Sequence, residues 1–105
     1  MIRPAAVAAI REQLAEALAG GAAIAAQATA PAGDGYFPPT LLTAVKDEMR
    51  VMREETFGPL LPVVRVADEA EAIRRANATS FGLSASVWTR DRARGLRVAQ
   101  RLEAG

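Results

Sequence analysis

The sequence Arg-Glu-Glu-Thr-Phe-Gly-Pro-Leu-Leu-Pro, residues 53–62, is the stretch around which the chain is organised. It is the only place where paired carboxylates, an aromatic ring, a glycine and two prolines lie together. Gly58-Pro59 can fix a sharp bend directly after Phe57 and hold its ring in one place. Glu54 and Glu55 are adjacent, so on an extended segment they point to opposite sides, and at most one of them serves a given site.

A carboxylate beside a fixed aromatic ring suits a nucleoside. The carboxylate can accept two hydrogen bonds from a vicinal diol such as that of ribose, and the ring can stack on a flat heterocycle. Spacing alone favours a simpler alternative, in which residues 53–62 form a charged turn around a buried Phe57 ring. Residue spacing therefore leaves both a ligand grip and a plain turn open.

Before this stretch, the sequence predicts a helix and a hairpin. Residues 4–18 carry apolar side chains at helical spacing, and Gly20-Gly21 ends this helix. The predicted apolar face consists of Val7, Ile10, Leu14 and Leu18. Residues 22–27 and 40–45 are two extended segments separated by a loop at residues 28–35, which predicts a hairpin.

After it, the pattern predicts two strand–helix units. Residues 60–66 are β-branched and nearly continuously apolar, as in a strand buried on both faces. Asp68 and Glu71 form a capping-box pattern that opens a helix to about residue 77. Residues 83–88 form a second predicted strand, and Asp91 caps a helix to about residue 102. This order predicts an α/β fold with mainly parallel pairing in its second half.

Composition limits the classes of function. The 105 residues include no cysteine and no histidine, which excludes disulfides, thiolate catalysis and the commonest general base, and we predict no metal site. A net charge of +1, from 13 basic and 12 acidic residues, gives no argument for binding nucleic acid. No apolar run approaches the ~20 residues that span a bilayer. We therefore expect a cytoplasmic protein.

Several motifs in the same order resemble the aldehyde dehydrogenase superfamily. Residues 54–59, Glu-Glu-Thr-Phe-Gly-Pro, resemble its Glu-Glu-x-Phe-Gly-Pro segment. Residues 36–40 resemble its Phe-x-x-Pro-Thr segment, and residues 81–91 its Gly-Leu-x-Ala-x-Val-Phe-Thr-x-Asp run. Residues 101–105 resemble the segment that leads into its Trp-Val-Asn. The resemblance covers essentially the whole chain and implies a single, incomplete catalytic domain over residues 1–105.

The resemblance implies NAD- or NADP-dependent oxidation of an aldehyde to a carboxylic acid. Glu55 then corresponds to the carboxylate that holds the nicotinamide ribose hydroxyls, and Phe57 to the ring beside the nicotinamide. The family's cysteine nucleophile, general-base glutamate and glycine-rich segment have no counterpart here, so we predict no catalytic residue within the chain. The resemblance also implies an aldehyde substrate and a homo-oligomer for the full-length enzyme.

Because the nucleophile is missing, the 105-residue chain alone is expected to be inactive. An alternative is that the polypeptide is a non-catalytic remnant that docks onto a full-length subunit, because its truncated sheet leaves unpaired strand edges. A further alternative is a small, unrelated binding domain that uses Glu55 and Phe57 to hold a nucleotide.

Overall fold

The computed structural model describes residues 3–105, which form two compact units with the boundary between Val64 and Arg65. We call them the N-terminal unit and the C-terminal unit. Helices accompany a three-stranded mixed sheet, which confirms the predicted α/β class. No helix within the described residues is long and apolar enough to cross a membrane.

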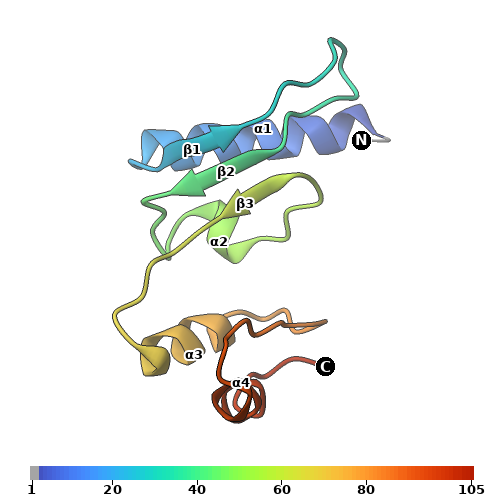
Figure 1. Cartoon of the computed structure of the whole chain (residues 1–105). Coiled ribbons are helices and arrows are strands. Elements are labelled where there is room, and N and C mark those ends of the chain that lie inside the picture. The colour runs from blue at the N-terminus through green and yellow to red at the C-terminus, as the bar shows by residue number, and fades with distance from the viewer. Residues whose placement is uncertain (1–2) are drawn as a thin grey trace. The chain divides into compact units, whose positions relative to one another are not determined.

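The N-terminal unit contains the sheet and residues 53–62, the stretch that carries Glu55 and Phe57 (Figure 1). Its elements are α1 (Pro4–Ala19), β1 (Ala23–Gln27), β2 (Thr40–Thr43), α2 (Arg50–Arg53) and β3 (Leu60–Pro62). The strand order is β1-β2-β3; β1 and β2 run antiparallel, which confirms the predicted hairpin, and β2 and β3 run parallel. The parallel pair places the start of β3, directly after the bend, beside the start of β2.

The end of α1 follows from its two glycines. Gly21 adopts a φ of 104°, the left-handed region that favours glycine. Its N–H donates to the Leu18 carbonyl at 3.1 Å, and the Ala22 N–H donates to the Ala17 carbonyl at 2.9 Å. This pair of bonds is a Schellman motif, which satisfies the last carbonyls of the helix and turns the chain into β1.

The core lies between α1 and one face of the sheet (Figure 1). Val7 and Ile10 of α1 are buried in the same cluster as Leu42 of β2 and Leu60 of β3. The prediction that Leu18 faces this core is wrong, because Leu18 is 39% exposed. The buried face of α1 instead continues through Gln13 and Ala17.

The opposite face of the sheet is open within this unit. Leu41 pairs with Leu61 across β2 and β3, and because side chains alternate along a strand, both point away from Leu42. Leu61 is 59% exposed, whereas Leu42 is fully buried. One face of the sheet is therefore packed by α1, and the other presents leucine to the surroundings.

The C-terminal unit contains two capped helices, α3 (Glu69–Asn77) and α4 (Arg92–Ala99). The Asp68 carboxylate accepts the Glu71 N–H at 2.8 Å, and the Asp91 carboxylate accepts the Arg94 N–H at 3.0 Å. Both predicted N-caps are confirmed. The second helix ends at Ala99, earlier than the predicted residue 102.

The predicted strand at residues 83–88 is wrong for this structure. The segment takes part in no ladder within residues 3–105, and Leu83 and Trp88 are each 92% exposed. A strand needs a hydrogen-bonding neighbour, and the described part of the chain offers this segment none. The other predicted strand, residues 60–66, is shortened to Leu60–Pro62, the three residues that pair with β2.

Candidate functional site

The candidate site begins at the short helix α2, which the sequence pattern did not predict. Glu54 follows α2 directly, and its N–H donates to the Arg50 carbonyl at 2.8 Å. The Arg50 guanidinium also donates to the Glu54 carboxylate, four residues along, at 2.9 Å. This hydrogen bond is the main cause that lowers the pKa of Glu54 below its ordinary value. Glu54 therefore stays ionised and is held against α2.

Glu55 and Thr56 are attached to α1 by one buried side chain, Gln13, which is 4% exposed. The Gln13 Nε2 donates to the Glu55 carbonyl at 3.3 Å, and the Thr56 hydroxyl donates to the Gln13 Oε1 at 2.8 Å. Gln13 is not among the residues predicted for the site. The one available signal is a polar side chain on the apolar face of the predicted helix.

The bend after Phe57 consists of two consecutive tight turns. The Gly58 N–H donates to the Thr56 carbonyl at 3.0 Å, and the Leu60 N–H donates to the Gly58 carbonyl at 2.9 Å. The Thr40 N–H then donates to the Pro59 carbonyl at 2.8 Å, which joins the bend to β2. The predicted bend at Gly58-Pro59 is confirmed, and hydrogen bonds fix it on both sides of Gly58.

The two predicted site residues are both exposed. The Phe57 ring is 73% exposed, so the alternative of a charged turn around a buried Phe57 is wrong. Glu55 is exposed, and within residues 3–105 no hydrogen bond or ion pair reaches its carboxylate. Of the adjacent glutamates, Glu54 is engaged by Arg50 and Glu55 is available to a ligand. The expectation that at most one of them serves a given site stays a prediction.

An apolar groove of about 470 Å³ adjoins the bend on the N-terminal unit. It is lined by small and apolar side chains of β1, β2 and β3 and by the bend itself. The lining includes Ala26, Leu41, Pro59 and Leu61. The groove therefore extends along the open face of the sheet and reaches Gly58-Pro59.

The family model that describes the "Aldehyde dehydrogenase family" matches residues 1–105. The chain belongs to the aldehyde dehydrogenase family. The resemblance seen in the Glu-Glu-Thr-Phe-Gly-Pro motif is thereby confirmed, and it places the chain in a family of oxidoreductases.

Relatives are similar over nearly the whole chain. The Escherichia coli (strain K12) succinate-semialdehyde dehydrogenase [NADP(+)] GabD is 45% identical over 101 residues, 95% of this chain and 21% of its own length. The Pseudomonas putida G7 salicylaldehyde dehydrogenase, solved in complex with salicylaldehyde, is 40% identical with a TM-score of 0.90. The alignment covers 100% of this chain and 21% of that one.

A third relative was solved with a cofactor. The NADP-dependent glyceraldehyde-3-phosphate dehydrogenase of Bacillus halodurans C-125, complexed with NADP, is 38% identical with a TM-score of 0.90. It is covered over 22% of its length, and this chain over 100%. The chain thus spans about a fifth of the length of the relatives that it matches.

Proposed function

We propose that this chain provides the part of an NAD(P)-dependent aldehyde dehydrogenase that holds the nicotinamide ribose. Glu55 accepts hydrogen bonds from the ribose hydroxyls, and the Phe57 ring lies beside the nicotinamide. The observation that carries this proposal is the pairing of an unengaged carboxylate with an exposed ring, two residues apart, on a segment held by hydrogen bonds.

The residues present fit the cofactor. A nicotinamide ribose needs an acceptor for two neighbouring hydroxyls, and the Glu55 carboxylate has two oxygens with no partner within the described chain. The Phe57 ring is exposed enough to receive a flat heterocycle. When bound, NAD(P)⁺ supplies the hydride acceptor for aldehyde oxidation. The contribution of this chain is to bind that cofactor and orient it.

The expected strength of this contact is moderate. Hydrogen bonds to a charged group contribute about 1.5–3 kcal/mol, which corresponds to roughly ten- to a hundredfold in affinity. Orientation adds to this value, because a small misplacement of a reacting group costs a large factor in rate. A carboxylate on a braced segment therefore has a larger effect on rate than its contribution to affinity indicates.

The reacting nucleophile must come from another part of the polypeptide, because the 105 residues contain no cysteine. We therefore expect no aldehyde oxidation by this chain alone. The cofactor can be NAD or NADP, and the substrate is an aldehyde. We propose that the full-length enzyme is a homo-oligomer.

A segment exchange tests this function. Residues 1–105 replace the matching segment of the E. coli GabD relative, and NADP⁺-linked oxidation of succinate semialdehyde is measured. We expect the exchanged protein to be active and the isolated chain to be inactive. A folded exchanged protein without activity, beside an active GabD control prepared identically, would refute the proposal.

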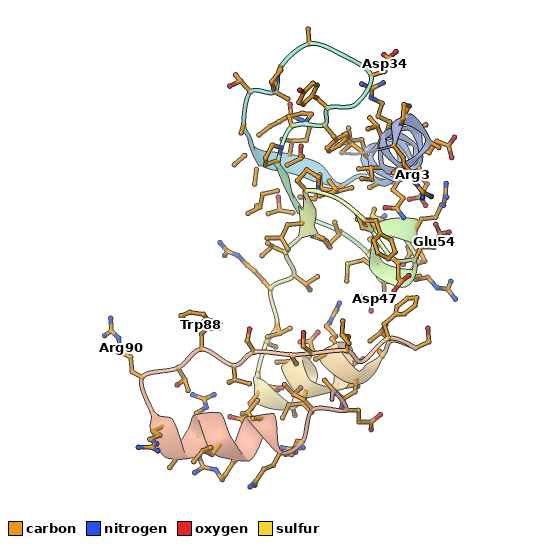
Figure 2. The ribbon with its side chains drawn as sticks, turned by 90° about the vertical axis from the view of Figure 1, so that its right-hand side faces the viewer. Arg3, Asp34, Asp47, Glu54, Trp88 and Arg90 are labelled. Atoms are coloured by element: carbon orange, nitrogen blue, oxygen red, sulfur yellow. The ribbon has the colours of Figure 1, made fainter. Side chains whose placement is uncertain are left out.

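Exposed apolar surface on each unit favours a second candidate function, docking without catalysis. The groove and Leu61 are open on the N-terminal unit, and Leu83 and Trp88 are open on the C-terminal unit, where Trp88 projects away from its ribbon (Figure 2). The occupant that we propose is the remainder of an aldehyde dehydrogenase polypeptide, because this chain spans only 21% of the GabD relative.

Sedimentation with a GabD polypeptide that lacks the matching segment tests docking. We expect a complex and a blue shift of Trp88 fluorescence as the indole leaves water. A strictly monomeric chain with unchanged fluorescence would eliminate this candidate.

Calorimetry of the isolated chain with NAD tests the remaining alternative, a small, unrelated nucleotide-binding domain. We expect little or no heat of binding.

A further inference from the structure

We propose that Gln13 is a positioning residue for the cofactor contact, which it controls from α1 through Glu55 and Thr56. This inference rests on the proposed function, since it assigns a role to the support of Glu55 and Phe57. Gln13 touches no cofactor and no reacting atom in this proposal. It acts by fixing the backbone from which the two binding side chains project.

The hydrogen bonds around residues 55 and 56 single out Gln13. Before them, the chain is fixed by the bond from the Glu54 N–H to Arg50. After them, it is fixed by the bond from the Thr40 N–H to Pro59. Between these two anchors, residues 55 and 56 form hydrogen bonds with one residue outside residues 53–62, which is Gln13. This statement applies to the described residues 3–105.

A primary amide suits this task because it carries a donor and an acceptor on one rigid group. The Gln13 Nε2 serves the Glu55 carbonyl while the Gln13 Oε1 receives the Thr56 hydroxyl. A leucine at this position would make neither bond, and a glutamate would keep the acceptor but place a negative charge beside Glu54 and Glu55. Glutamine alone among these three side chains satisfies both partners without a charge.

Helix α1 is firmly packed around Gln13. Val7, Ile10 and Ala17, on the same face of α1, are at most 2% exposed and pack into the core. Gln13 is itself 4% exposed, so water does not readily replace either of its partners. Displacement of residues 55 and 56 relative to the sheet therefore requires two poorly hydrated hydrogen bonds to break.

Amide hydrogen exchange on the 105-residue chain tests the support itself. The reporter is the Gly58 N–H, which donates to Thr56 and is protected only while residues 56–58 keep their turn. Gln13→Leu and Thr56→Val are each expected to raise its exchange rate about tenfold, the factor that corresponds to ~1.4 kcal/mol. Thr56→Ser keeps the hydroxyl and is expected to restore the original rate.

A matched control separates local loosening from global loss of stability. Thr43→Val makes the same chemical change at a half-buried threonine of β2 outside the Gln13 pair, and it should leave Gly58 exchange unchanged. Exchange of the Leu42 amide reports unfolding of the sheet. If Gly58 exchange is unchanged in both Gln13→Leu and Thr56→Val, the inference is overturned.

The exchanged GabD protein described above links this support to the cofactor. Gln13→Leu and Thr56→Val are expected to raise the KM for NADP⁺ and lower kcat about tenfold, with the aldehyde KM nearly constant. The inference is overturned if Gln13→Leu and Thr56→Val raise the exchange rate of the Gly58 amide but leave kcat and the KM for NADP⁺ unchanged, while Glu55→Gln lowers activity. If Glu55→Gln is also without effect, the proposed function fails while the support by Gln13 stands.

Discussion

Replacement of Leu42 by alanine should destabilise the N-terminal unit far more than the same replacement of Leu61. Leu42 is fully buried between α1 and the sheet, so its truncation leaves a cavity, and such changes cost about 2–5 kcal/mol. Leu61 lies on the neighbouring strand but on the opposite face and is 59% exposed. Its truncation removes little buried surface, and we expect a cost of about 1 kcal/mol or less.

Urea unfolding of the 105-residue chain, followed by far-ultraviolet circular dichroism, to which α1 contributes as the longest helix, measures both changes. With a slope of about 1–3 kcal/mol per molar urea, Leu42→Ala should lower the midpoint by roughly 1 M or more. Equal midpoints for Leu42→Ala and Leu61→Ala would refute the arrangement in which α1 covers only one face of the sheet.

The same pair of variants reports on docking. If the remainder of an aldehyde dehydrogenase polypeptide covers the groove, Leu61 becomes buried, and its truncation should then cost about 1.5–3 kcal/mol of binding. A complex that forms equally well with Leu61→Ala would show that this face is not the docking surface.

Three further predictions concern the supports of the two units. Gly21→Ala should destabilise α1 by about 1–2 kcal/mol through backbone strain alone, because φ is 104° and no atom lies within 4 Å of an added Cβ; circular dichroism that matches the parent in urea would contradict this. Asp68→Ala should destabilise α3 by about 1 kcal/mol, because the Glu71 N–H loses its acceptor, whereas Asp68→Asn should cost much less; amide exchange across α3 distinguishes them. Hydrogen bonds from the Ala67 N–H, which has the larger effect, and from the Arg75 guanidinium lower the pKa of Glu71 below its ordinary value of 4.5. Its contribution to stability is therefore complete above that pH and is lost as the pH falls through the lowered pKa; Glu71→Gln should flatten this acid limb in a pH series of thermal unfolding.

Much of the fold follows from local sequence. The end of α1 follows from Gly20-Gly21, and the starts of α3 and α4 follow from Asp68 and Asp91, because capping depends on residues within one turn. The hairpin was predictable because two short apolar segments flank a loop rich in glycine and proline. Each of these features is decided by neighbours along the chain.

The features that escaped prediction depend on distant partners. Residues 83–88 have the pattern of a strand, but pairing requires a neighbour that the described chain does not offer them. Leu18 has the right spacing for the core, yet the sheet meets α1 along the side that carries Gln13 and Ala17. Local spacing specifies which faces exist, and tertiary packing decides which face is buried.

The candidate site divides in the same way. Glu55 and Phe57 were predicted from the motif, and the exposure of Phe57 removes the buried-ring alternative. Gln13 was not identified, because its partners lie 42 and 43 residues away along the chain. The motif therefore predicts candidate side chains, whereas the hydrogen bonds of Gln13 to their segment depend on the tertiary fold.

The central claim is that Glu55, and not its neighbour Glu54, holds the cofactor. The most direct measurement compares Glu55→Gln with Glu54→Gln in the exchanged GabD protein, by the affinity for NADP⁺ and the single-turnover rate of hydride transfer. We predict that Glu55→Gln weakens affinity roughly ten- to a hundredfold and slows hydride transfer, while Glu54→Gln, whose side chain is held by Arg50, changes either quantity far less. Unchanged affinity and rate in Glu55→Gln, or an equal loss in both variants, would contradict the claim.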